Sequence, residues 1–188
     1  MLKTSKLGWL SRFARDRRGL SAVEFAIIAP VMIGLYLGCV EISDGVAADR
    51  KVNLTAATLA NLAAEVTTIS NADMTNILNA STAIMAPYSS ANLKATLSCL
   101  KIDKNGAVTV AWSAATANAT ARAAGSSVTI PADLAVPNSW LLFSEASYAY
   151  KPAVGYTISG TLTLSDTMYM APRIAPPSYG DANPISCT

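Results

Sequence analysis

Residues 15–40 read RDRRGLSAVEFAIIAPVMIGLYLGCV, and this stretch decides the fold. A basic cluster ends at Gly19, one carboxylate follows at Glu24, and the residues from Phe25 to Val40 carry no charge. As a helix, the 21 residues from Leu20 to Val40 rise ~31 Å, close to the ~30 Å hydrocarbon thickness of a bilayer. The stretch predicts one retained membrane-spanning helix; a cleaved signal peptide and a core helix are the alternatives.

Charge divides unevenly between the two sides of this stretch. Residues 1–19 hold six basic side chains and one acidic one, whereas the remainder holds eight basic and eleven acidic ones. Positive charge beside a span keeps that side in the cytoplasm. We therefore expect a basic cytoplasmic leader at residues 1–19, a single membrane span at residues 20–40, and a remainder on the far side of the membrane, which in a bacterial inner membrane is the periplasm. Alternatively, the basic residues of the leader only orient the membrane segment and have no further function.

The helix is expected to continue beyond the membrane. Apolar residues recur there at spacings of three or four, which is the period of an amphipathic helix with one apolar stripe. They are Ile42, Val46, Val52, Ala56, Leu59, Leu62, Val66 and Ile69. One helix is thus predicted from about Leu20 to about Ile69, with a periplasmic continuation over residues 41–69 that packs against a soluble domain.

Residues 70–188 are expected to form that domain, beginning with a short helix. Ser70 to Asp73 offer capping oxygens for it, and it is predicted to end before Pro87. Its apolar residues are Met74, Ile77, Leu78 and Met85.

Strand patterns follow at residues 93–102, 108–112, 142–150 and 157–170, the last with a bend at Gly160. Asn105-Gly106 predicts a hairpin turn between the first two, because both residues tolerate positive φ. Residues 113–124 predict a loop or weak helix, and the Pro-rich tail from Arg173 an irregular segment. A long membrane-spanning amphipathic helix, a short helix and a roughly four-stranded antiparallel sheet make an α+β fold.

Three residues inside the span are candidates for helix packing. Gly34 and Gly38 form a Gly-x-x-x-Gly pentad that allows close approach of a second helix, although such pentads also arise by chance. Pro30 frees the carbonyl of Ala26 and is expected to kink the helix, with or without a functional consequence. Cys39 reads as a small apolar filler.

Cys99 and Cys187 both lie outside the cytoplasm in this topology. Two cysteines in an oxidising compartment predict one disulfide, here closing a loop between a strand and the tail. Two free thiols, or a bond between subunits, are the alternatives.

Enzyme chemistry finds little support in the sequence. The chain has no His, no Cys-x-x-Cys and no phosphate-binding Gly-rich loop, so no metal or cofactor is expected. Asp133, Glu145 and Asp166 leave an anchored hydrolase as a remote alternative. Nucleic-acid binding is not expected either, because the chain beyond residue 19 is net acidic and lacks a dense basic cluster.

Two groups of residues resemble the TadE-like family of minor pilins (pseudopilins) from Tad-type (tight adherence, Flp) type IV pili. The N-terminal group is Arg17-Arg18-Gly19, Ala22-Val23-Glu24-Phe25-Ala26, Pro30 and Glu41. The C-terminal group comprises residues 145–152, 161–165 and 169–173.

The resemblance implies a prepilin-peptidase substrate, cut between Gly19 and Leu20. Glu24 then becomes the fifth residue of the mature chain and, with Phe25 beside it, pairs with the N-terminal amine of a neighbouring subunit during assembly. A partnerless carboxylate at headgroup level is the alternative for Glu24.

The implied partners are the peptidase, other pilins and minor pilins, the inner-membrane assembly platform and membrane lipid. The implied location is the inner membrane or the extracellular pilus, with a role in pilus assembly, adhesion or secretion. The alternative function is an uncleaved, single-pass anchor that scaffolds an envelope complex.

Overall fold

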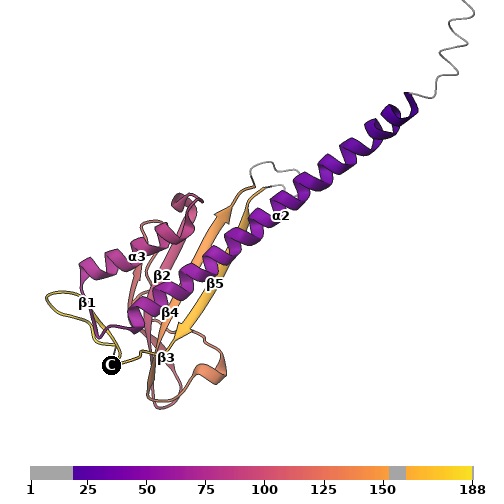
Figure 1. Cartoon of the computed structure of the whole chain (residues 1–188). Coiled ribbons are helices and arrows are strands. Elements are labelled where there is room, and N and C mark those ends of the chain that lie inside the picture. Colours follow the sequence, from indigo (N-terminus) through magenta and orange to yellow (C-terminus); the bar gives the residue numbers. More distant parts are fainter. Residues whose placement is uncertain (1–18, 153–159, 188) are drawn as a thin grey trace, which may run out of the picture.

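The computed structural model describes residues 19–152 and 160–187. A long helix, α2 (Leu20–Ala64), is followed by a shorter helix, α3 (Asn71–Met85). Four strands form one antiparallel sheet in the order β3-β2-β4-β5: β2 (Leu93–Ile102), β3 (Val108–Ala115), β4 (Ser139–Tyr150) and β5 (Leu162–Met170). Figure 1 shows α2 leaving this domain as a single continuous helix. The expected α+β class is confirmed. Of the predicted leader, residues 1–19, all but Gly19 lie outside the described residues.

Only the C-terminal part of α2 packs against the domain, where it contacts β4, β5 and α3. Its buried face is built mainly from small residues: Gly45, Ala48, Val52, Thr55, Ala56, Leu59, Ala60, Ala63 and Ala64. Short side chains let the helix axis lie close to the sheet. The predicted stripe is therefore partly wrong, since Ile42, Val46 and Val66 are exposed. The prediction relied on the spacing of large apolar residues and so overlooked most of the alanines and the glycine that contact the sheet.

The predicted end of the long helix at Ile69 is also wrong, because α2 ends at Ala64. The residues after it are β-branched from Val66 to Ile69, which disfavours helix and favours strand. Thr68 and Ile69 form β1, which pairs in parallel with β6 (Ser178–Tyr179) from the tail. Ile69 is thereby buried in the core rather than placed on a helix.

The short helix begins with a capping box. The Ser70 hydroxyl accepts a bond from the Asp73 amide at 3.0 Å, and the Ser70 amide donates to the Asp73 carboxylate at 3.2 Å. These bonds satisfy amides that the first turn leaves without helical partners. The hydrogen bonds from Ser70 also lower the pKa of Asp73, because they stabilise its ionised form.

The hairpin between β2 and β3 is wider than a two-residue turn. Residues 103–107 connect the strands, and of the pair Asn105-Gly106 only the glycine has positive φ, at 82°. The Asp103 carboxylate accepts the amides of Asn105 and Ala107, both at 2.8 Å. These bonds lower the pKa of Asp103 and fix the loop. Asp103 was the turn residue that the sequence reading missed.

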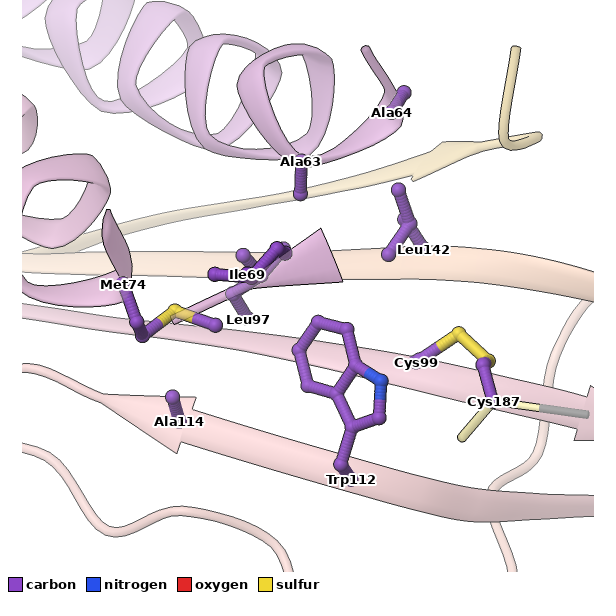
Figure 2. Packing of buried hydrophobic residues seen from close by; sticks show 10 residues of the cluster. All are labelled: Ala63, Ala64, Ile69, Met74, Leu97, Cys99, Trp112, Ala114, Leu142 and Cys187. Carbon is purple, nitrogen blue, oxygen red and sulfur yellow. A yellow bond between two sulfur atoms is a disulfide. The ribbon is translucent and has the colours of Figure 1, made fainter. Parts of the chain in front are cut away.

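The tail is not wholly irregular, because it closes the domain beside the end of α2. The Trp112 indole donates to the carbonyl of Pro177 at 2.9 Å, and its ring packs on Tyr179 with centroids 5.5 Å apart. Figure 2 shows Cys187, joined to Cys99 by a disulfide, within the same cluster as Trp112 and Leu142. The tail therefore covers a buried tryptophan that the sheet and α2 leave uncovered.

The opposite face of the sheet is covered by the segment after β3, which contains no α-helix. Val128, Ile130 and Leu134 pack on Leu100, Val110 and Phe143 from β2, β3 and β4. The sheet thus has two cores, one under α2 and α3 and the other under this segment. Both faces of the sheet are therefore covered in this region.

We predict that Cys187→Ser destabilises the domain without abolishing its fold. The disulfide separates residues by 88 positions, and closing a loop of that length is worth about 4 kcal/mol in the chain-entropy treatment. Urea unfolding of the full chain in detergent measures the loss, and the variant should migrate more slowly in a non-reducing gel. Cys39→Ser is the matched control, because Cys39 lies exposed outside this core. Equal unfolding and equal mobility of wild type and Cys187→Ser would contradict the stabilising role.

Candidate functional site

The candidate site is the part of α2 that no other described element covers. Its large apolar side chains are exposed from Leu20 to Tyr36, with Phe25 at 72% and Ile27 at 68% of full exposure. In the described ranges α2 is the one helix long and apolar enough to cross a membrane, and its most apolar 18-residue window is only 6% buried. A core helix would be buried by its own domain, so that alternative does not fit. Exposure of this kind requires lipid or other helices.

The residues of the proposed processing and pairing step lie at the free end of this helix. Gly19 precedes the first turn as its N-cap, and a side chain added there would meet no atom within 4 Å. Glu24 and Phe25 are both exposed, and Glu24 forms no ion pair within residues 19–152 and 160–187. The geometry therefore leaves both the peptide bond after Gly19 and the carboxylate accessible to another molecule.

Pro30, Gly34 and Gly38 lie at successive spacings of four, so they share one side of α2. They line a shallow apolar depression of about 660 Å³ together with Val31, Leu35, Cys39 and Ile42. The depression exists because two of its residues have no side chain. Sequence reasoning found the three small residues but missed Ile42, which it had assigned to the face against the domain.

The exposed and the packed parts of α2 meet at Glu41, which is only 2% exposed. One turn further, Gly45 lies so close to the sheet that an added Cβ would be 3.8 Å from the Tyr150 ring. The Tyr88 hydroxyl donates to the carbonyl of Asp44 at 3.1 Å, and its ring lies edge-on to Tyr150. Burial raises the pKa of Tyr150, and the nearby carboxylates of Asp44 and Glu41 raise it further. The phenol therefore stays neutral and its ring packs as an apolar group.

The remaining sequence candidates are scattered. Cys99 and Cys187 come together, with Cα atoms 6.0 Å apart, at the far end of α2 from Glu24. Glu145 is paired with Arg122, Asp166 accepts a hydrogen bond from Asn53 of α2, and Asp133 lies in a short 3-10 helix at Ala132–Leu134. Glu145 and Asp166 both line one polar cleft, but Arg122 holds the first and Asn53 the second, and Asp133 lies outside that cleft. Among the described residues no cluster of three or more metal-ligating side chains occurs.

Comparison with known families now bears on this helix. Residues 19–61 match the family model of TadE-like proteins. The match begins at the N-cap glycine and ends three residues before α2 does. It confirms the expected resemblance for this segment and supports a pilus-associated, pilin-like role, in a family of structural proteins rather than enzymes. Curated proteins and solved structures give no match to the chain. The C-terminal part of the resemblance stays a prediction.

The TadE-like segment is thus almost the whole of α2. It joins the exposed half, which fits a single-pass membrane anchor, to the half that holds the domain. The match to the family model therefore lies in this helix and does not extend into the sheet.

We predict that filling the depression weakens association of α2 with other helices. Gly34→Ile and Gly38→Ile each place a branched side chain where two helices otherwise approach closely, which should reduce self-association severalfold. Crosslinking of the full chain in membranes measures the effect. Ala26→Ile is the control, since Ala26 lies on the exposed helix but outside the depression. An equal effect of all three substitutions would show that added bulk, and not the depression, is responsible.

Proposed function

We propose that this protein is a minor pilin or pseudopilin of a Tad-type pilus, which acts through helix packing and not through catalysis. The single observation that carries the proposal is a TadE-like helix with an exposed apolar half that contains one carboxylate, at Glu24. A helix of this kind can rest in lipid before assembly and pack against other pilin helices afterwards. The domain then travels with it, because α2 is continuous from one part to the other.

Membrane orientation follows from charge in this proposal. The six basic residues of the leader hold residues 1–19 at the cytoplasmic surface, residues 20–40 span the inner membrane, and the domain lies in the periplasm. Partners are prepilin peptidase, other pilins and minor pilins, and the assembly platform. Membrane lipid covers the exposed apolar side chains until subunits replace it.

Processing between Gly19 and Leu20 is the first step. A peptidase needs an extended backbone close to its own catalytic groups, and Gly19 has no Cβ to hinder that approach. Cleavage removes the basic leader, leaves an α-amino group on Leu20 and places Glu24 five residues into the mature chain.

We predict that Gly19→Val blocks this step. N-terminal sequencing and intact mass of protein recovered from membranes should give a wild-type chain that starts at Leu20 and a variant that starts at Met1. Gly8→Val is the matched control, because it makes the same change inside the leader and away from the bond. A wild-type chain that starts at Met1 in cells with active peptidase would instead favour the uncleaved anchor that scaffolds an envelope complex.

Glu24 supplies the second step. A carboxylate within a membrane segment costs about 2.5 kcal/mol or more, and an opposite charge nearby offsets that cost. The α-amino group of Leu20 on a neighbouring subunit is the charge that processing creates. Pairing of the two fixes the axial position of one helix against the next, because an unpaired charge in low dielectric is strongly disfavoured.

We predict that Glu24→Gln preserves membrane insertion but prevents incorporation into pili. The amide keeps the size of the side chain and removes its charge, whereas Glu24→Asp keeps the charge and should retain part of the function. Pili sheared from cells and probed for the protein measure incorporation, and membrane fractions measure insertion. Wild-type incorporation of Glu24→Gln would remove the charge pair from the mechanism.

A further inference from the structure

A polar cleft of about 570 Å³ lies on the sheet face turned away from α2, and neither anchoring nor assembly uses it. Its floor comes from β2, β4 and β5, and its wall is the segment 118–122 that follows β3. Neighbouring positions on the same strands, Ala146 and Leu164, point the other way and pack with Ala48 of α2. The cleft therefore opens on the side of the domain opposite the helix.

The wall is held in place at both ends. The Arg122 guanidinium donates two bonds of 2.7 Å to the Glu145 carboxylate and lies 5.4 Å from the centre of the Phe143 ring. The Arg122 amide also donates to the Ser113 hydroxyl at 3.0 Å. At the other end, the Asn118 side chain donates to the Ala91 carbonyl at 2.9 Å. A bidentate ion pair and a ring contact fix a side chain in one geometry, so the cleft is largely preformed.

The floor places hydroxyl groups in register across three strands. Ser147 lies opposite both Lys94 and Ser165, which gives one row, and Glu145 lies opposite both Thr96 and Thr167, which gives the next. Side chains directly opposite each other in antiparallel strands are about 4.5–5.5 Å apart at Cβ. Four hydroxyls and one ammonium thus gather over an area that a few sugar rings can cover.

These groups have hydrogen-bonding capacity to spare. Within the described part of the chain, no hydrogen bond or ion pair engages the Lys94 amine or the side-chain hydroxyls of the floor. Those hydroxyls belong to Thr96, Ser147, Ser165 and Thr167. The lining contains no large apolar side chain, so the cleft does not fit an apolar ligand. Asp166 also lines the cleft, but its carboxylate accepts hydrogen bonds from Asn53 of α2 and from the Thr167 amide, and the Glu145 carboxylate is held by Arg122. Lys94 is therefore the charged group of the lining whose charge is not already offset. Donors and acceptors side by side with this cation fit a molecule rich in hydroxyls that also carries a carboxylate.

We propose that this cleft binds a segment of acidic polysaccharide, with a hexuronate carboxylate at Lys94 and sugar hydroxyls over the serine and threonine rows. Arg122 donates to Glu145 through Nε and Nη2, so its Nη1 is available to donate to the same ligand. The chain beyond residue 19 is net acidic, with eleven acidic and eight basic residues, so general attraction of a polyanion to it is weak. Binding then depends on this local arrangement. The proposal is independent of the role in pilus assembly.

Calorimetric titration of the full chain in neutral detergent with trigalacturonate tests the proposal. The wild type should bind one trisaccharide per chain. Lys94→Gln, which removes the ammonium, and Thr167→Val, which removes a hydroxyl at constant size, should each weaken binding about tenfold or more. The fully methyl-esterified trisaccharide keeps its hydroxyls and loses its charge, and it should also bind about tenfold more weakly.

Two control variants separate the cleft from general effects. Lys104→Gln removes a lysine in the hairpin loop, and Thr163→Val changes a threonine on the same face of β5 outside the cleft. Both should bind like the wild type, and the leader is identical in every variant. Ser147→Ala replaces Thr167→Val if thermal unfolding shows that the latter is misfolded. No binding by the wild type, equal binding of the methyl ester, or equal losses in Lys94→Gln and Lys104→Gln would overturn the proposal.

Discussion

The contact between α2 and the sheet is the constraint on which the rest of the structure depends. Ala48, Val52 and Ala56 pack against Ala146, Tyr148 and Leu164, and short side chains make up most of the buried face of α2. Leu59 is its largest fully buried side chain, and such burial is worth roughly 1.5–3 kcal/mol. These contacts hold the C-terminal part of α2 against β4 and β5.

The two halves of α2 therefore lie in different environments. Below Glu41 its apolar residues face outward, and above it small residues face the domain. Val46 and Leu54 remain exposed at the level of the domain and continue the apolar surface beyond the span. Subunits packed side by side can bury this surface along most of the helix. In the proposed function the exposed residues of α2 serve assembly, whereas its buried residues hold the domain together.

The tail and the segment after β3 complete the domain from opposite sides. Tyr179, Pro177 and Cys187 cover Trp112 at the end of α2, and Val128 and Ile130 cover the outer core. Apart from β6 and one short 3-10 helix these segments are irregular, yet each buries an apolar surface that the sheet alone leaves open. The ion pair between Arg122 and Glu145 joins one of them to β4 and leaves the polar cleft beside it. The domain is therefore more elaborate than its short list of strands indicates.

The sequence by itself determined the long apolar helix, the α+β class, the capped second helix and the placement of Gly19, Glu24, Pro30, Gly34 and Gly38 along the first helix. Those features are local. An uncharged run, a capping residue and a spacing along the chain can each be recognised without knowing which residues pack against them. Only the tertiary structure decided that α2 ends at Ala64, that Ile42 and Val46 face outward, and that the tail pairs with β1. The face of α2 that packs on the sheet is the one that lets the helix and the sheet approach most closely. Alanine and glycine allow that approach, but they add little to the hydrophobic periodicity from which the sequence predicted the buried face. The floor of the cleft likewise exists only through strand register, which places Lys94 opposite Ser147 and Thr96 opposite Glu145 although each pair is far apart in the chain.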